Sequence, residues 1–480
     1  MDETRRYGET VPEDGTRRSA SPVVVPGRRH IHQPVPRHTR GGEWIDERVG
    51  VRGLNQKYGR KAFPVHTTFF FGEMAAFSFI ILVVTGIYLG LIYIPSSAPV
   101  EVNGQELPEA YASVKLIESI PVANLFRNVH HWAAHLMVFS ILLHTIRIFF
   151  FGTYRKPREL NWIIGVVLLI LTLLAGFLGY ALPFDSYAVT ATGIGFSIAR
   201  SVPLVGDVAS ELFFGGAFPS LGSLPRLYTL HIFVVPVLIA MATGAHILLV
   251  IKNKHSQPGY ARKMAEPGKV LGVPAWPYQA LLAGQLFLLM FGALFILSAL
   301  FEIHPLAAYG PPGPGTPEVK PDWYLLWVFG FLEIVPSSAS FSTPIGTIGP
   351  QFLGGLVFPG VVFTLIFLAP WLDRTNRGRH VPRYEYLQPP TQAPLRLAIG
   401  VWLLSYIGML FVTGYHNELG LSVGQTWYLS LLIPTILAGA SFAFARWRDP
   451  DYSRRFDPTA EPDEVDHVVA RPIDDGRRDE

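Results

Sequence analysis

Four histidines in two apolar stretches are the residues of this sequence best suited to chemistry. His130 and His144 lie fourteen residues apart in one stretch, and His231 and His246 lie fifteen apart in another. In a helix each separation returns the two side chains to within roughly 40–60° of one face and places them about 21 Å apart along the axis. Each helix therefore offers one imidazole near each of its ends.

The absence of cysteine from the 480 residues narrows the possible metal chemistry. Disulfides, thiolate zinc sites, iron–sulfur clusters and thioether-attached haem are excluded, so histidine is the remaining ligand for a transition metal. An imidazole in hydrocarbon is costly unless its nitrogens are satisfied, and a metal bond combined with an N–H hydrogen bond satisfies them. A single such histidine would more simply bond a neighbouring carbonyl. Four at matched depths favour two bis-histidine sites.

His131 and His135 are competing ligands in the same stretch as His130. Their i, i+4 spacing could bind a metal without further help. No equivalent pair faces them on the stretch of His231, so we expect them to be spectators near one membrane surface.

Glycines with a matching spacing occupy two further apolar stretches. Gly72 and Gly86 are fourteen residues apart, as are Gly165 and Gly179. A flat macrocycle needs a neighbouring helix without a side chain at its level, although glycine is also common wherever membrane helices pack closely. The shared vertical repeat predicts a four-helix bundle with a porphyrin wedged at each histidine level.

Three arginines lie within five residues of these histidines, namely Arg127, Arg147 and Arg226. Guanidinium groups at these depths could neutralise haem propionates through charge-assisted hydrogen bonds. The alternative is that each extends to lipid phosphates at the end of its helix.

Eight stretches hold the roughly 20 apolar residues needed to cross the hydrocarbon core. Since 50% of the residues are hydrophobic and only 16% are charged, we expect an all-α membrane protein with eight transmembrane helices. The formal net charge is only +3, so no nucleic-acid partner is implied. The stretches are residues 67–94, 126–151, 161–181, 227–251, 278–301, 351–372, 394–415 and 425–446.

Basic residues gather in the connections after the second, fourth and sixth stretches, which the positive-inside rule places in the cytoplasm. They are Arg155, Lys156, Arg158, Lys252, Lys254, Arg262, Lys263, Arg374, Arg377, Arg379 and Arg383. The other connections are poorer in Lys and Arg and face the opposite, p side. His130 and His231 are then expected near the p side, His144 and His246 near the cytoplasm, and both termini in the cytoplasm.

The connection after the fifth stretch is about fifty residues long and contains two unusual segments. Pro311-Pro312-Gly313-Pro314-Gly315 is followed by Pro321-Asp322-Trp323-Tyr324 and an apolar run. A long loop with apolar content at a membrane surface is usually functional, although it could simply cover the helices.

Several motifs together resemble cytochrome b of the bc1 and b6f complexes over about residues 55–445. They are Arg127-Asn128-Val129-His130 through His144-Thr145-Ile146-Arg147, Gly179-Tyr180-Ala181-Leu182-Pro183, Arg226-Leu227-Tyr228-Thr229-Leu230-His231 and Pro321-Asp322-Trp323-Tyr324. Fusion of all eight stretches in one chain resembles the bc1 type. The fifteen-residue histidine spacing and Pro274-Ala275-Trp276-Pro277 resemble the b6f type.

The resemblance implies two non-covalent b haems and a division of the chain into four parts. His130 and His231 would bind the low-potential haem iron, and His144 and His246 the high-potential haem iron. The covalent third haem of the b6f type is excluded, because the chain has no cysteine for it. The expected parts are a polar cytoplasmic arm (1–55), a dihaem four-helix bundle (56–260), a C-terminal four-helix region (261–446) and a charged cytoplasmic tail (447–480).

In the cytochrome b family, the connection after the fifth helix, which here contains Pro321–Tyr324, and the end of the third helix form the quinol oxidation site. Here the matching residues are Pro321, Asp322, Trp323 and Tyr324, with Tyr180 on the other wall. Asp322 stands where the family has Glu; the carboxylate is kept and its reach is one methylene shorter. The quinone reduction site is expected at the cytoplasmic ends of the first, fourth and fifth helices, where the candidates are His66, Lys252 and His255. A basic loop contacting lipid is the alternative for each candidate.

The resemblance further implies a Q cycle in a respiratory quinol:cytochrome c reductase of the cell membrane. A quinol beside Asp322 and Tyr324 would give one electron to a Rieske iron–sulfur protein and the other to the p-side haem, with its protons released on the p side. The second electron would cross to the other haem and reduce a quinone near the cytoplasm. A c-type cytochrome subunit, a homodimer and membrane lipid are the further expected partners.

Two rival functions make different demands on the sequence. A haem b anchor subunit of a dehydrogenase usually has four or five spans and would not use the last three stretches. A secondary transporter with intramembrane histidines as a proton relay would be colourless, and the chain lacks the inverted repeats of that class.

Overall fold

The computed structural model describes residues 40–50, 53, 59–64, 66–259, 261, 270–313, 320–344, 346–376 and 386–449. Contacts divide the chain into two units, Met1–Gln56 and Lys57–Glu480. In the first unit, helix α1 (Arg40–Val49) holds the Arg48 guanidinium 4.2 Å from the centre of the Trp44 ring. Most of the predicted arm (1–55) and tail (447–480), and the basic residues Arg262, Lys263, Arg377, Arg379 and Arg383, lie outside the described residues.

Eight helical spans in the described part of the second unit are long and apolar enough to cross a membrane, which confirms the predicted all-α fold with eight spans. Three spans contain a π-helical turn. The spans are α3 (Phe70–Gly90, after η2, Thr67–Phe69); α5 (Pro121–Phe150); α6 (Glu159–Ala181); α9 (Ser223–Thr229) with η3 (Leu230–Val234) and α10 (Val235–Asn253); η4 (Ala275–Gln279) with α12 (Ala280–Leu300); α15 (Pro350–Phe352) with η5 (Leu353–Val357) and α16 (Phe358–Leu372); α17 (Pro394–Thr413); and α18 (Val423–Arg448).

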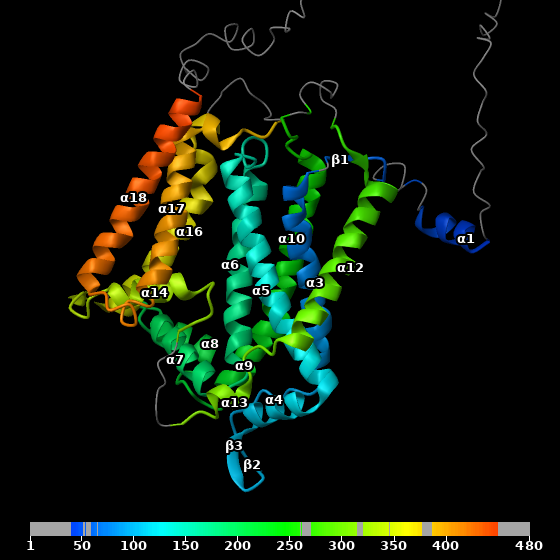
Figure 1. Cartoon of the computed structure of the whole chain (residues 1–480). Coiled ribbons are helices and arrows are strands. Elements are labelled where there is room, and N and C mark those ends of the chain that lie inside the picture. Colours follow the sequence, from blue (N-terminus) through cyan, green and yellow to red (C-terminus); the bar gives the residue numbers. More distant parts are fainter. Residues whose placement is uncertain are drawn as a thin grey trace, which may run out of the picture. The chain divides into compact units, whose positions relative to one another are not determined.

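Short elements fill the connections at the two ends of this unit. One end carries the pair β1 (Ala62–Phe63) and β4 (Val273–Pro274), and the other carries the hairpin β2 (Pro99–Val102) and β3 (Gln105–Pro108); we call them the β1 end and the hairpin end (Figure 1). The remaining elements are α4 (Glu109–Ser119), α7 (Ser186–Arg200), α8 (Gly206–Phe214), α13 (Leu306–Tyr309), α14 (Leu326–Ile334), β5 (Phe341–Thr343), β6 (Gly346–Ile348), η6 (Arg374–Asn376) and η7 (Pro390–Gln392). The long connection after α12 is thus structured, with α13, α14 and a second hairpin in its described part.

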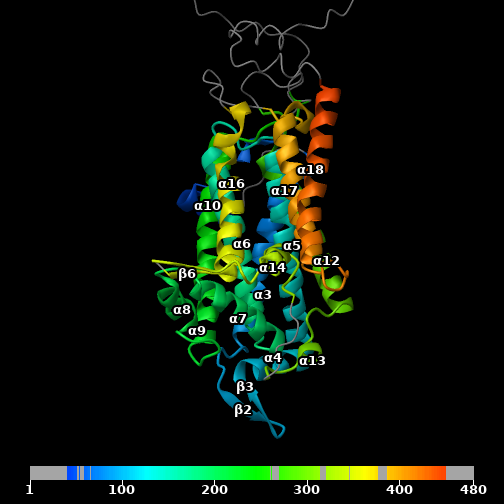
Figure 2. The same cartoon turned by 90° about the vertical axis from the view of Figure 1, so that its left-hand side faces the viewer.

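The first four spans form the predicted bundle. Helix α3 packs on α5, α5 on α6 and α6 on α10, while α12 lies against α3 and α5. The last three spans form a second group, in which α17 pairs with α18 and α16 contacts α6 (Figure 2). Helix α14 packs against α17 at the hairpin end, so the long connection ties the two groups together.

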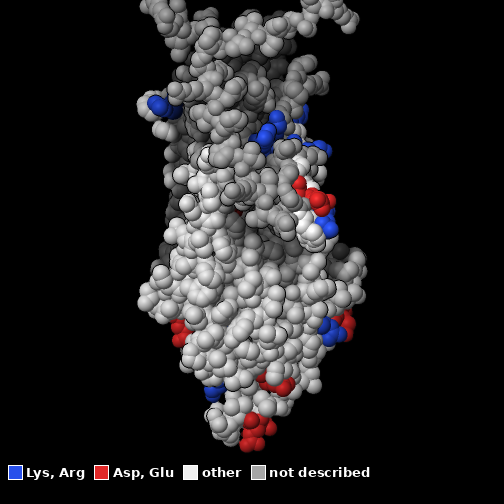
Figure 3. Space-filling model, turned by 90° about the vertical axis from the view of Figure 1, so that its right-hand side faces the viewer, with Lys and Arg blue, Asp and Glu red and all other residues white. Residues whose placement is uncertain are grey.

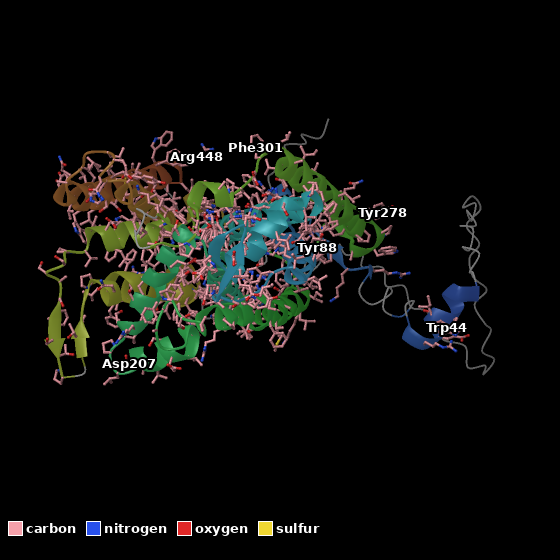
Figure 4. All side chains as sticks on the ribbon, turned by 90° about the horizontal axis from the view of Figure 1, so that it is seen from below. Trp44, Tyr88, Asp207, Tyr278, Phe301 and Arg448 are labelled. Atoms are coloured by element: carbon pink, nitrogen blue, oxygen red, sulfur yellow. The ribbon has the colours of Figure 1, made fainter. Side chains whose placement is uncertain are left out.

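Apolar side chains point outward along the spans. Ile87, Met241 and Leu289 are each about two-thirds exposed or more, at 65%, 67% and 70%. On the face drawn in Figure 3 charged side chains are sparse among the described residues, and seen along the bundle in Figure 4, Tyr278 and Arg448 lie on its outside. Such a surface favours hydrocarbon over water as its solvent.

Candidate functional site

The four histidines meet as two facing pairs between α5 and the fourth span. The ring centroids of His130 and His231 are 6.2 Å apart, and those of His144 and His246 are 6.4 Å apart. Both pairs have an interplanar angle of 69°. Two metal–nitrogen bonds of about 2.0 Å plus about 1.1 Å from each nitrogen to its ring centre add up to about 6.2 Å, so each pair fits one metal ion between its rings.

The π turn η3 explains how unequal spacings give matching levels. His231 lies within η3 (Leu230–Val234), while α5 is α-helical throughout Pro121–Phe150. A π turn takes up one residue more than an α turn. The fifteen residues between His231 and His246 therefore cover about the same rise as the fourteen between His130 and His144. The difference between the fourteen-residue and fifteen-residue spacings was the sequence signal for this extra residue.

Each predicted glycine lies against one histidine ring. A Cβ atom at Gly72 would lie 3.2 Å from Cε1 of His144, and one at Gly86 would lie 3.2 Å from Cε1 of His130. At Gly179 the distance to Cε1 of His231 would be 2.6 Å, and at Gly165 that to His246 would be 3.5 Å. The spacing suggested that these glycines make room for the edge of a macrocycle. In the structure, the close neighbour of each glycine is the imidazole ring itself.

Hydrogen bonds at the hairpin end fix which nitrogen of each ring is available. Thr85 donates its hydroxyl hydrogen to the carbonyl of Ile81 at 2.7 Å, so its oxygen accepts from Nδ1 of His130 at 2.9 Å. The carbonyl of Ala175 can only accept, so Nδ1 of His231 donates to it at 3.0 Å. With Nδ1 protonated in both rings, Nε2 keeps its lone pair for a metal.

At the β1 end, a cluster around the Phe69 ring holds polar groups without partners. The Arg147 guanidinium lies 4.2 Å from the centre of the Phe69 ring, and its Nε and Nη2 atoms are buried with no hydrogen bond among the described residues. Nδ1 of His144 is in the same condition. Two buried guanidinium nitrogens without a hydrogen bond suit an anionic ligand group such as a propionate.

The same cluster contains two of the three candidates for the quinone reduction site. The His66 ring centroid lies 5.4 Å and that of His255 6.0 Å from Phe69. Burial, together with the charges of Arg147 and Arg158, lowers the pKa of His255 to about 4. The third candidate, Lys252, is exposed at the end of α10.

Arg127 and Arg226, the other two arginines predicted to lie near haem propionates, donate hydrogen bonds to backbone carbonyls. Arg127 is buried and donates to the carbonyls of Ile303 and His304, at 3.3 and 2.6 Å, and its Nη1 lies 3.4 Å from Glu118. Arg226 is exposed and donates to the Gly222 carbonyl at 2.9 Å. Arg127 therefore holds the connection after α12 against α5, a structural contact that the sequence did not predict.

The segment Pro321–Tyr324 packs against α5 and α6 at the hairpin end. The Tyr324 side chain is buried, and a Cβ atom at Gly176 would lie 2.8 Å from its hydroxyl oxygen, so this glycine on α6 makes room for the ring. Burial, the charge of Asp322 and a hydrogen bond with its carboxylate raise the pKa of Tyr324 well above its ordinary value. The carboxylate and the phenol thus form one polar pair in a largely apolar setting.

A group of aromatic and acidic side chains extends from Tyr180. Its buried hydroxyl has no hydrogen-bond partner among the described residues, and its ring lies 5.5 Å from that of Tyr187 and 5.7 Å from that of His304. His304 in turn contacts the buried Asp185 at 2.8 Å. Burial and the charge of Asp322 raise the pKa of Tyr187 to about 12. Sequence reasoning missed Tyr187, His304 and Asp185, which carry no periodic signal.

His135 is more than the spectator that was expected from the sequence. Its Nδ1 accepts a hydrogen bond from Nε1 of Trp323 at 3.0 Å, and its ring lies 5.0 Å from that of His131. Ligand atoms of His131, His135 and Asp322 lie within 4.8 Å of one another. The sequence did not predict this hydrogen bond, because only partners on the fourth span were considered and Trp323 lies in the connection after α12.

Glu73 is a further residue that sequence reasoning missed. It follows Gly72 on α3 and accepts a hydrogen bond from Gln279 at 2.7 Å, while its other oxygen is buried without a partner among the described residues. An acidic residue in a helix of mean apolar character was a usable signal.

A helical membrane bundle with a facing histidine pair at each end is the arrangement of a membrane-bound b-type cytochrome. Comparison with known proteins agrees: the family described as "Cytochrome b(N-terminal)/b6/petB" matches residues 135–311, and "Cytochrome b(C-terminal)/b6/petD" matches residues 314–429. The cytochrome bc1 complex cytochrome b subunit of Streptomyces coelicolor is 35% identical over 426 residues, covering 83% of this chain and 75% of the relative.

A second relative and a solved structure are similar over most of their lengths. The cytochrome bc1 complex cytochrome b subunit of Mycobacterium tuberculosis is 34% identical over 398 residues, which cover 80% of this chain and 71% of the relative. A chain of "Hyperthermophilic respiratory Complex III" has the same fold, with a TM-score of 0.63 at 23% identity, over 84% of this chain and 96% of that one. The chain belongs to the cytochrome b family and is the cytochrome b subunit of a bc1-type complex III, a respiratory oxidoreductase.

Proposed function

We propose that this subunit oxidises quinol at the hairpin end and transfers electrons across the membrane to a quinone-reducing site at the β1 end, as in a Q cycle coupled to proton translocation. The observation that carries the proposal is the pair of histidine sites, one at each end of the bundle, with equal ring spacing. The hairpin-end pair shares helix α5 with His135, which is bonded to the Pro321–Tyr324 segment. A redox centre and a substrate site would therefore be neighbours.

Two non-covalent b haems fit the residues present. His130 and His231 would hold one iron, and His144 and His246 the other, with Arg147 as the best-placed partner for a propionate and Arg127 and Arg226 as further candidates. When bound, the haems supply the one-electron redox chemistry of the transfer across the membrane. The chain contributes axial ligands, their orientation and the glycine faces Gly72, Gly86, Gly165 and Gly179 against which the rings pack.

Asp322, Tyr324 and Tyr180 are the proposed polar residues for quinol oxidation, with Pro321 and Trp323 shaping the segment. Asp322 would accept a quinol proton, and the two phenols would orient the substrate. A pocket of about 520 Å³ lies between α7 and α14, with Ser186 and Thr190 among its lining residues; Asp322, Tyr324 and Tyr180 do not line it, so it is separate from the proposed polar residues. Protons released by the oxidation would leave on the p side.

Quinone reduction is proposed at the β1 end, in the cluster around Phe69. His66 and His255 lie beside that ring, and Lys252 is at the nearby end of α10. The proposed division of labour gives residues 56–260 the haems and residues 261–446 the Pro321–Tyr324 segment.

The proposed setting is the cell membrane, with the β1 end in the cytoplasm together with both termini. The basic residues of the connections at that end support this orientation. A Rieske iron–sulfur protein, a c-type cytochrome subunit and a second copy of the complex are the proposed partners. The named relatives are subunits of bc1 complexes, which supports a multisubunit assembly.

Spectroscopy of the purified complex tests the proposal. The wild-type complex should show a reduced b-type spectrum with two components and should pass electrons from quinol to cytochrome c. His130→Leu and His246→Leu should each remove one component and stop turnover. A spectrum without haem, or one in which neither variant removes a component, contradicts the proposal.

A further inference from the structure

His135 stands between helix α5 and the segment proposed to bind quinol. Its Nδ1 atom accepts the hydrogen of the Trp323 indole at a distance of 3.0 Å. An indole nitrogen can only donate, so in this contact Nδ1 must be the acceptor. A neutral imidazole carries one hydrogen, which therefore resides on Nε2, and Nε2 becomes a donor.

This tautomer argues against a metal site. The ligand atoms of His131, His135 and Asp322 lie within 4.8 Å of one another. A metal bond to Nε2 of His135 needs a lone pair on that nitrogen. While Nδ1 accepts the hydrogen of Trp323, Nε2 carries the ring hydrogen and has no lone pair to offer. The cluster is therefore better suited to hydrogen bonding between the imidazole and the carboxylate.

Asp322 is an acceptor close to this donor, since ligand atoms of the two side chains lie within 4.8 Å of each other. Its carboxylate acts by charge on His135 and also bonds with the Tyr324 hydroxyl. The Tyr324 ring centroid lies 6.3 Å from that of His135, so the three side chains surround one small volume. Among the described residues, His131 of the same helix also faces His135, with His304 beyond it at 6.2 Å from His131.

We propose that His135 is a positioning residue for the Asp322 carboxylate, tied down by Trp323 and presenting its Nε2 hydrogen to Asp322 either directly or through one water. The inference rests on the proposed quinol oxidation. An aspartate has a short side chain, and a donor on α5 would hold its carboxylate in place. The quinol proton passes to the Asp322 carboxylate and forms the acid, and His135 stays neutral throughout.

Variants at this position separate the two hydrogen bonds. His135→Asn keeps an acceptor near the position of Nδ1 for Trp323 and loses the donor, whereas His135→Gln places an amide N–H near the position of Nε2. His135→Ala removes both. Quinol oxidation by each purified complex is measured as kcat and KM at a series of pH values from about pH 3.5 to pH 9, and the position of the acid limb is read from the kcat profile.

The acid limb of the kcat profile should move to higher pH by about one unit in His135→Ala and His135→Asn, because a carboxylate without its donor binds a proton more readily. His135→Gln should shift it less, and KM should change little. In an Asp322→Glu background, His135→Ala should shift the acid limb less than it does in the wild type, because the longer side chain depends less on the donor. His416→Ala, which removes a buried histidine bonded to the Thr413 carbonyl, is the matched control and should leave the limb in place.

An active wild type in which His135→Ala and His135→Asn keep the wild-type acid limb overturns the inference. The inference is also overturned if His135→Ala shifts the acid limb equally in the wild type and in the Asp322→Glu background. Failure of the wild-type complex to oxidise quinol at all would instead count against the proposed function, so the two failures are distinguishable.

Discussion

The two ends of the bundle present the same pair of histidine rings in different surroundings. Ring separations of 6.2 and 6.4 Å and a common interplanar angle of 69° make the pairs nearly equivalent. At the hairpin end Nδ1 of each ring is held, by Thr85 and by the Ala175 carbonyl. At the β1 end Nδ1 of His144 has no such partner among the described residues. Ring separation is therefore set by the helices, the π turn and the glycines rather than by these hydrogen bonds.

Polar contacts at the β1 end instead join the connecting loops. Arg396 on α17 bonds Asp373 at 3.0 Å, and both side chains are almost fully buried. Tyr154 donates to the same carboxylate at 2.7 Å, which links the loop after α5 to the loop after α16. Both ends use buried polar contacts to fix loops, since Arg127 holds the connection after α12 at the hairpin end, and the hairpin end in addition holds Nδ1 of both histidine rings.

Arg396→Ala should produce the largest change in stability. Removal of one partner from a buried ion pair leaves the other charge uncompensated and costs about 3–5 kcal/mol. Thermal unfolding of the purified complex should begin at clearly lower temperature, while the protein that remains folded keeps both haem components. Arg448→Ala, at an exposed position, is the control. Loss of a haem component with unchanged stability would show that the β1-end ligands depend on this loop contact.

Alanine at the glycine faces should act unequally on the two pairs. Gly179→Ala would bring a methyl group to 2.6 Å from His231, which overpacks the site at a cost of about 1–3 kcal/mol and lowers occupancy of the hairpin-end haem. Gly165→Ala meets His246 at an ordinary 3.5 Å and should leave the β1-end haem unchanged. Haem content per polypeptide measures both. Equal losses of haem in the two variants would contradict the prediction that Gly179 is the more crowded position.

Thr85→Val should alter only the hairpin-end haem. The valine keeps the shape of the side chain and removes the acceptor of the Nδ1 hydrogen of His130, which makes the ligand less basic and the oxidised iron less stable. We expect the midpoint potential of that component to rise by about 20–60 mV, roughly 0.5–1.5 kcal/mol for one electron. Redox titration of both components is the measurement. Thr172→Val, which removes a hydroxyl bonded to the Leu168 carbonyl, should change neither potential.

Acid should release the loop contact at the β1 end, with a small effect at ordinary pH. Burial alone would raise the pKa of Asp373, but the Arg396 guanidinium and hydrogen bonds from Tyr154 and Thr375 bring it below its ordinary value of 3.8. A depressed folded pKa means that the stabilisation is present above about pH 4 and is lost as the pH falls through the folded pKa. Unfolding temperatures between about pH 6 and pH 3 should therefore fall more steeply for the wild type than for Asp373→Asn. Parallel curves would remove Asp373 as the cause.

The sequence predicted the spans and the histidine pairs because both follow from local regularities. Apolar length identifies a membrane helix, and helical rise relates His130 to His144 without knowledge of tertiary structure. The partners of His135 and Arg127 could not be predicted in this way. Trp323 and the His304 carbonyl lie in the connection after α12, more than 150 residues away, and only packing brings them to α5.

The haem content of the purified protein tests most directly that a metal porphyrin binds between each pair of rings. A pyridine haemochrome assay should give about two b haems per polypeptide for the wild type, and about one for His231→Leu and for His144→Leu. A wild-type ratio of one or zero, or single variants that keep both haems, would contradict the assignment of one haem to each histidine pair.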